Sequence, residues 1–205
     1  MKLSRHSIAV LSTTAGMIML AGAAPAQTLS GEALVKALRR GGYVIVMRHT
    51  SSPRDVPDKR TANPDNVKPE RQLDEVGRTT ATAMGKALRD LKSPVGDVLA
   101  SPTYRALETV KYAQWDNPHA YPELGDNGQS MQGGTEAQAA WLRKRVTQFP
   151  SGSNTILVTH LPNIAGAFPQ ASGVDDGESL VFGPDGKGGA ALVARIKIEE
   201  WPKLR

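Results

Sequence analysis

Short apolar runs mark the predicted strands of this chain. The run Tyr43–Met47 is apolar throughout, and shorter apolar runs lie within 97–100 and 155–159. Continuous apolar runs of this length are typical of strands that are buried on both faces, as in a parallel sheet. Segments 178–182 and 190–198, joined by a glycine-rich turn, are predicted to be two edge strands.

Helical periods separate these strands. Ser30, Asp74 and Thr135 are predicted helix caps, and Gln138 stands at the capping-box position after Thr135. Strands that alternate with helices favour an α/β fold. We therefore predict a single domain, a three-layer α/β/α sandwich with a mostly parallel central sheet. Its helices are expected at 32–40, 74–91, 106–114, 135–149 and 163–168.

Residues 1–26 have the pattern of a secretory signal peptide. Lys2 and Arg5 precede an apolar segment from Ile8 to Ala23, and the small residues 24–26 precede the predicted cleavage site. An uncleaved N-terminal anchor is the alternative. Cleavage would leave residues 27–205 as the mature domain, in the periplasm or outside the cell, with no stable membrane span.

The amino-acid composition limits the kinds of site and partner that the chain can have. The chain has 205 residues and no cysteine, which excludes disulfides, thiol nucleophiles and cysteine metal sites. Removing Lys2 and Arg5 lowers the formal net charge from +5 to +3. This excess suits an anionic partner, but it is too small to indicate binding to nucleic acid.

Three predicted strands end in residues that can carry chemistry. Arg48 and His49 follow the first strand, Arg105 follows the second after a short turn, and His160 follows the third. The carboxyl ends of parallel strands meet at one sheet edge, where α/β folds bind ligands, so these side chains are expected to converge. For Arg48 and His49 taken alone, a solvated strand end without a role is the alternative.

The composition of this group is that of an anion pocket. Guanidinium groups match phosphate oxygens bidentately, a neutral histidine is a competent nucleophile, and a second histidine can donate a hydrogen bond to developing charge. Thr50 and Ser52 are expected to bind the substrate too, because their backbone N–H groups can approach a phosphate. The chain has no H-x-H, H-x-x-x-H or D-x-D spacing, so we expect neither a metal nor an organic cofactor.

Four motifs, in order along the mature chain, resemble the histidine phosphatase (phosphoglycerate mutase-like) superfamily. They are Val46–Thr50, similar to the Arg-His-Gly signature, Leu73–Ala81, similar to Leu-Thr-x-x-Gly-Arg-x-x-Ala, Ser101–Thr109, which matches Ser-Pro-x-x-Arg-Ala-x-x-Thr, and Val158–His160. Segments 176–179 and 200–201, together with the signal peptide, resemble the secreted bacterial branch that includes lipopolysaccharide core heptose phosphatases.

The resemblance implies a role for each strand-end residue. His49 would attack phosphorus in line and become a phosphohistidine, Arg48 and Arg105 would hold the phosphoryl oxygens, and His160 would stabilise the equatorial charge. Water would then release phosphate. The implied activity is that of a phosphomonoesterase on a small exported substrate or an envelope phosphate group.

The sequence departs from the family pattern at two positions near the signature. Thr50 replaces the usual glycine, and Asp55 stands where mutase relatives carry an asparagine. A negative side chain at Asp55 would oppose a phosphate, which disfavours a mutase more than a phosphatase. The proline-rich stretch 51–71 that follows is either a binding loop or a surface excursion.

The proton donor to the leaving oxygen is the least defined part of the predicted site. Acid phosphatase relatives use an Asp directly after the second histidine, and here that position is Leu161. Asp126, in Leu124-Gly125-Asp126, is the closest match to the Leu-x-Glu donor of mutase-like relatives. The other candidate carboxylates are Glu123, Glu136 and Glu178.

Two alternative functions use the same residues. One is a phosphatase that removes phosphate from protein phosphohistidine, and the other is a non-catalytic binder of a phosphate ligand that has lost turnover. Export from the cytoplasm disfavours the first. The predicted pocket loops, 51–71 and 117–134, carry no readable specificity for one substrate.

Overall fold

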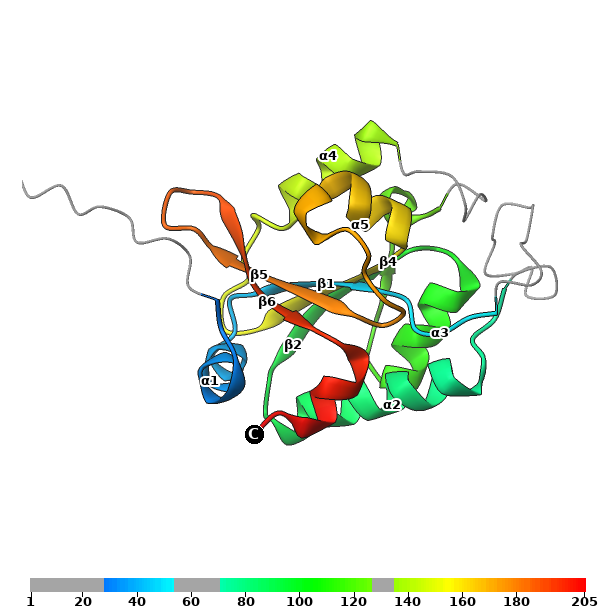
Figure 1. Ribbon diagram of the computed structural model, residues 1–205, viewed down its shortest axis with the longest axis horizontal. Helices are drawn as coiled ribbons and strands as arrows, with labels where there is room; N and C mark the ends of the chain where they lie inside the picture. Colours follow the sequence, from blue (N-terminus) through cyan, green and yellow to red (C-terminus); the bar gives the residue numbers. More distant parts are fainter. Residues whose placement is uncertain (1–27, 54–70, 127–134) are drawn as a thin grey trace, which may run out of the picture.

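A computed structural model describes residues 28–53, 71–126 and 135–205. The predicted signal peptide and Asp55 lie outside these ranges. Within them, six strands form one sheet in the order β3-β2-β4-β1-β5-β6 (Figure 1). The strands are β1 (Val44–Arg48), β2 (Val95–Ala100), β3 (His119–Ala120), β4 (Asn154–Thr159), β5 (Ser179–Pro184) and β6 (Ala190–Ile196).

The sheet is mostly parallel, as expected. β1 pairs with β4, β4 with β2, and β2 with β3, all in parallel, whereas β5 is antiparallel to both of its neighbours. The prediction of two edge strands near the C-terminus was wrong for β5, which lies between β1 and β6. Its residues Ser179 to Gly183 are buried, because β5 is covered on both faces, and the short strand β3 forms the second edge instead.

The helices lie close to their predicted positions. Asp74 caps α2 by accepting a hydrogen bond from the Gly77 N–H, and Thr135 forms the expected capping box with Gln138. α4 ends at Arg145, one turn before the predicted end. The helices are α1 (Gly31–Arg40), α2 (Glu75–Asp90), α3 (Tyr104–Ala113), α4 (Glu136–Arg145) and α5 (Leu161–Ala167), with 3₁₀ turns η1 (Pro122–Leu124), η2 (Pro169–Ala171) and η3 (Ile198–Lys203).

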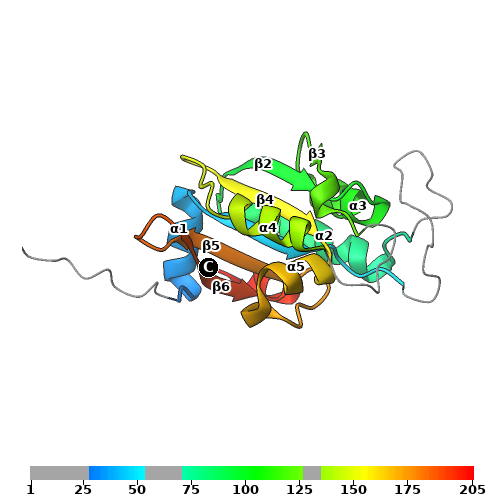
Figure 2. The ribbon, with the colours of Figure 1, turned by 90° about the horizontal axis from the view of Figure 1, so that it is seen from above.

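Two hydrophobic cores lie on opposite faces of the sheet. Successive side chains of a strand point to opposite faces. Ile45 and Met47 of β1 therefore pack in the core beneath α1, α2, α3 and η3, whereas Val44 and Val46 pack in the core beneath α4 and α5. Figure 1 shows the two helical layers below and above the sheet, and Figure 2 shows α4 and α5 lying over the strands. This is the expected three-layer sandwich, and it explains why the run Tyr43–Met47 is apolar throughout.

Helices α2 and α3 approach each other at Gly85. A Cβ atom built at this position would lie 1.9 Å from the carbonyl oxygen of Ala113, which is backbone and has little freedom to move. At Gly166 of α5, a Cβ would lie 3.6 Å from the Ala139 methyl carbon, an ordinary contact. The two glycines therefore differ in packing although both are helical.

This difference predicts opposite effects of the same substitution. Gly85→Ala should lower the free energy of unfolding by about 1–3 kcal/mol, because the clash outweighs alanine's helix propensity. Gly166→Ala should leave it unchanged or raise it by up to about 1 kcal/mol. Urea denaturation of both variants measures the difference, and equal stability would show that the α2–α3 contact adjusts at no cost.

Candidate active site

Two buried histidines meet at the carboxyl ends of β1 and β4. Arg48 is paired with Thr159 in the parallel register of these strands, so His49 and His160 follow at the same level. The His49 N–H continues the ladder by donating to the Thr159 carbonyl oxygen at 3.0 Å. The two imidazole rings lie 5.2 Å apart, edge to face, and both side chains are buried. The predicted convergence of the strand ends is therefore confirmed.

The hydrogen bonds of His49 define its tautomer. Its Nδ1 lies 2.8 Å from the Thr50 carbonyl oxygen, which can only accept, so Nδ1 carries the hydrogen. In the neutral ring the lone pair is then on Nε2. The Arg105 Nε–H donates to that atom at 3.2 Å. His49 Nε2 is thus the nitrogen of this ring that can attack an electrophile.

In His160 the hydrogen and the lone pair are on the opposite ring nitrogens from those in His49. Its Nδ1 lies 3.2 Å from Nη2 of Arg105, which can only donate, so Nδ1 carries the lone pair. The Nε2–H then donates to the Ser101 hydroxyl at 2.8 Å, and Ser101 donates to Thr103 at 3.0 Å. Ser101 and Thr103 were not predicted as site residues, although both stand in the motif that begins at Ser101.

Arg105, at the start of α3, joins these groups to a carboxylate. Its Nη2 donates both to His160 and to Asp126, which forms a buried ion pair with it. The side chains of Arg105 and Asp126 are only 3% and 5% exposed. The structure therefore brings Asp126, His49, His160 and Arg105 into one cluster, although they come from separate parts of the chain.

Arg48 lies beside this cluster and contacts a different segment. Its Nη1 donates to the Val174 carbonyl oxygen at 3.0 Å, and its Nη2 lies 2.6 Å from a carboxylate oxygen of Asp176. The backbone N–H of Gly177 donates to the His49 carbonyl oxygen at 3.0 Å. The segment before β5 is thus attached to both predicted site residues at the end of β1. In the sequence, Asp176 belongs to segment 176–179, which resembles the secreted branch, and it is not a predicted site residue.

Thr50 and Ser52 both form hydrogen bonds within the protein. The Thr50 N–H donates to the hydroxyl of Thr109 on α3 at 3.2 Å, and the Ser52 hydroxyl donates to the Gln72 carbonyl oxygen at 2.8 Å. The Thr50 N–H thus bonds to Thr109 in this structure, where a free N–H facing a phosphate was expected. Thr109 fills the last position of the motif that contains Arg105, and it was not predicted as a site residue.

The other candidate proton donors lie elsewhere. Glu136 is exposed and pairs with Arg143 on the surface of α4. Glu178 is buried and pairs with Arg195 of β6. Burial alone would raise the pKa of Glu178, but hydrogen bonds from Arg195 and from the Asp175 N–H outweigh it and lower the pKa. Glu123 is half-buried in η1. Within the described contacts, Asp126 is the carboxylate of these four that bonds to Arg105.

Burial and positive charge keep both histidines neutral. The pKa of His49 is well below its usual value of 6.5, first because the ring is buried and then because His160, Arg105 and Arg48 lie nearby. The pKa of His160 is lowered in the same way by burial, Arg105 and the two more distant guanidinium groups of Arg71 and Arg48. A neutral His49 has the unprotonated nitrogen that a nucleophile requires.

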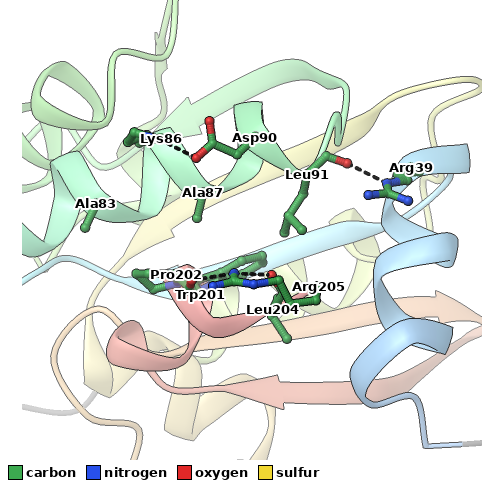
Figure 3. Close-up of a pocket in the computed structure, with 10 residues that line it drawn as sticks. All are labelled: Arg39, Ala83, Lys86, Ala87, Asp90, Leu91, Trp201, Pro202, Leu204 and Arg205. Carbon is green, nitrogen blue, oxygen red and sulfur yellow. Dashed lines mark hydrogen bonds and ion pairs between the residues drawn. The ribbon is translucent and has the colours of Figure 1, made fainter.

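A hollow of about 590 Å³ lies away from this cluster, between α2 and the C-terminal residues (Figure 3). Its lining residues include Ala87, Leu91 and Leu204, and Lys86, which also lines it, is paired with Asp90. None of the ten residues that line it is a histidine. The hollow therefore has no imidazole that could act as a histidine nucleophile.

The described part of the chain shows neither a metal-binding cluster nor a membrane-spanning helix. In residues 28–53, 71–126 and 135–205, no group of three or more His, Cys, Asp or Glu side chains is arranged to hold a metal ion. No helix in these ranges is both long and apolar enough to cross a bilayer.

Solved structures share the fold of this chain, although no protein-family model and no curated protein matches its sequence. The protein histidine phosphatase SixA, complexed with tungstate, aligns with a TM-score of 0.56 and 18% identity over 77% of this chain and 98% of its own. YhfR of Bacillus stearothermophilus gives a TM-score of 0.53 and 17% identity, covering 73% and 94%. Phosphoserine phosphatase of Entamoeba histolytica, in complex with 3-phosphoglyceric acid, gives 0.52 and 15%, covering 76% and 96%. At these identities the likeness establishes the α/β fold.

The lowered histidine pKa values predict that acid destabilises the protein. Below about pH 6.5 an unfolded histidine binds a proton that the buried, neutral ring does not. The free energy of unfolding should therefore fall with decreasing pH, by up to about 1.4 kcal/mol per pH unit for each histidine, until the folded pKa values are reached. Denaturant titrations between about pH 7 and about pH 5 measure this slope.

Two variants test the source of the slope. His160→Gln removes one of the two titrating groups, so its stability should depend less steeply on pH. His119→Gln, at an exposed position of β3, is the control and should keep the slope of the parent protein. Equal slopes in all three proteins would contradict the assignment to the buried histidines.

Proposed function

We propose that this protein is a phosphomonoesterase of the histidine phosphatase superfamily, with His49 as nucleophile and no metal requirement. The observation that carries the proposal is the buried cluster in which the unprotonated Nε2 of His49 accepts a hydrogen bond from Arg105, which also bonds to His160 and Asp126. The four sequence motifs and the shared fold of the phosphatase structures support it. Such a cluster combines a nucleophile, anion-binding groups and an acid.

The first step transfers the phosphoryl group to His49. Nε2 attacks phosphorus while the bond to the leaving oxygen breaks, and Asp126 gives its proton to that oxygen. Arg48 and Arg105 stabilise the charge on the phosphoryl oxygens, and His160, which accepts from Arg105 through Nδ1, holds that guanidinium group in place. In the second step water attacks phosphorus, Asp126 takes the proton of that water, and the nitrogen–phosphorus bond breaks to release phosphate. His49 regains its lone pair and Asp126 its proton.

The Arg105–Asp126 ion pair holds the proposed proton donor beside a group that is expected to bind the phosphoryl oxygens.

The substrate that we propose is an exported small phosphate ester or an envelope phosphate group. The signal-peptide pattern of residues 1–26 supports a periplasmic or secreted location, and the net charge of +3 that remains after cleavage suits an anionic substrate. The resemblance of segments 176–179 and 200–201 to the secreted branch points in the same direction. A second candidate is a protein phosphohistidine, favoured by the shared fold with the protein histidine phosphatase SixA. Assays of a phosphohistidine-bearing protein beside small esters separate the two.

The proposed function makes a prediction about the nucleophile. The mature chain should hydrolyse p-nitrophenyl phosphate in the presence of EDTA, and His49→Ala should reduce this to background, because no other described group replaces Nε2. His119→Ala, at an exposed histidine, should retain the parent rate. Equal hydrolysis by the parent and His49→Ala, or loss of activity on addition of EDTA alone, would refute the proposal.

The second prediction concerns the proton donor. p-Nitrophenolate leaves readily without a proton, whereas the phenolate of phenyl phosphate is a poorer leaving group of similar shape. Asp126→Asn should therefore lower kcat/KM for phenyl phosphate by about 10²-fold or more, and for p-nitrophenyl phosphate much less. If Asp126→Asn changes neither value, the donor is another group.

A further inference from the structure

The backbone just before Asp126 is fixed by the side-chain amide of Asn163. Asn163 lies in the first turn of α5 and is 1% exposed. Its Nδ2 lies 3.1 Å from the Leu124 carbonyl oxygen and 2.8 Å from the Gly125 carbonyl oxygen. These are the two carbonyl groups that immediately precede Asp126, so the amide sets the course of the chain into that residue.

Two further side chains bond to the same carbonyl groups. The Thr159 hydroxyl donates to the Leu124 carbonyl oxygen at 2.8 Å, and Gln138 Nε2 donates to the Gly125 carbonyl oxygen at 2.8 Å. Asn163 Nδ2 also lies 3.0 Å from the Thr159 hydroxyl oxygen. All three side chains are buried, where an amide or hydroxyl without a partner is costly. The segment 124–126 is thus bonded to β4, α4 and α5 at once.

The geometry of this contact couples Asp126 to His160. Thr159 directly precedes His160, and Asn163 follows it by three residues, so the same junction of β4 and α5 positions the histidine and the carbonyl groups. Asp126 then reaches Arg105, which also bonds to both histidines. Any shift of the segment before Asp126 would change the distance between the carboxyl group and this cluster.

We propose that Asn163 is a positioning residue, which places the Asp126 carboxyl group for proton transfer to the leaving oxygen. Asn163 itself touches neither the substrate nor the reacting atoms in this role. The inference rests on the proposed phosphatase function and on Asp126 as donor. It assigns to the Asn163 amide a catalytic effect that is separate from its contribution to stability.

Asn154 offers a matched structural control. It is fully buried at the opposite end of β4, and its Nδ2 also makes three hydrogen bonds, to the Leu38 carbonyl at 2.8 Å, to Ser93 at 3.1 Å and to the Pro94 carbonyl at 3.2 Å. Truncation at either position removes a similar set of hydrogen bonds. Of these two asparagines, only Asn163 bonds to the segment that carries the proposed donor.

The experiment compares Asn163→Ala with Asn154→Ala on p-nitrophenyl phosphate and phenyl phosphate. Asn163→Ala should lower kcat/KM for phenyl phosphate by about tenfold or more and for p-nitrophenyl phosphate by less than about threefold, because a misplaced acid affects the poorer leaving group. Asn154→Ala should lower the thermal midpoint and leave the ratio of the two values unchanged. In Asn163→Ala, the Leu124 carbonyl still bonds to Thr159 and the Gly125 carbonyl still bonds to Gln138, which favours folding of this variant. A second variant, Asn163→Ser, should show the same selective loss.

A double variant identifies the residue through which Asn163 acts. In Asp126→Asn, the additional change Asn163→Ala should cause no further loss on phenyl phosphate, since the donor is already absent. A uniform loss on both substrates, an unchanged ratio in Asn163→Ala and Asn163→Ser, or full additivity in the double variant would overturn the proposal.

The results distinguish a failure of the proposed function from a failure of the donor assignment or of the positioning role. A parent protein without phosphatase activity refutes the proposed function, and the positioning role with it. A selective loss that is absent in Asp126→Asn refutes the donor. A selective loss present in Asp126→Asn and absent in both Asn163 variants refutes the positioning role alone.

Discussion

The buried guanidinium group of Arg105 is the interaction on which the site depends. A charge removed from water costs several kcal/mol unless it is paired and its hydrogens are bonded. Asp126 supplies the opposite charge, and the lone pairs of His49 and His160 accept hydrogen bonds from Nε and Nη2 of Arg105. Because a guanidinium group only donates, it determines which nitrogen of each ring carries the lone pair. One buried cation thereby orients the nucleophile, the second histidine and the acid.

The fold makes this arrangement possible through the register of two neighbouring strands. β1 and β4 pair in parallel and end at the same level, which places His49 and His160 side by side. The helix that carries Arg105 is attached to the end of β1 by the Thr50–Thr109 hydrogen bond. The sheet and α3 therefore bring the cation to both rings without a long loop between them.

In this structure both arginines of the proposed phosphate site bind a carboxylate. Arg105 pairs with Asp126, and Arg48 pairs with Asp176. A phosphate ester that enters the site must rearrange or share these pairs. Anion binding by the proposed enzyme is thus an exchange of one negative group for another.

The sequence by itself determined five of the six described strands, the Asp74 and Thr135 caps, the α/β class and the convergence of Arg48, His49, Arg105 and His160, because these follow from apolar periodicity and from residues adjacent to strand ends. The two-residue strand β3 has no such periodicity, and the predicted cap Ser30 makes no side-chain cap hydrogen bond. The sequence also selected Asp126, through its likeness to a family motif. Tertiary structure decided which carboxylate reaches Arg105, because Asp126 is placed by side chains from β4, α4 and α5 that no local pattern connects. It decided equally that β5 is an interior strand and that Asp176 pairs with Arg48, since both depend on which segments pack together after the chain has folded.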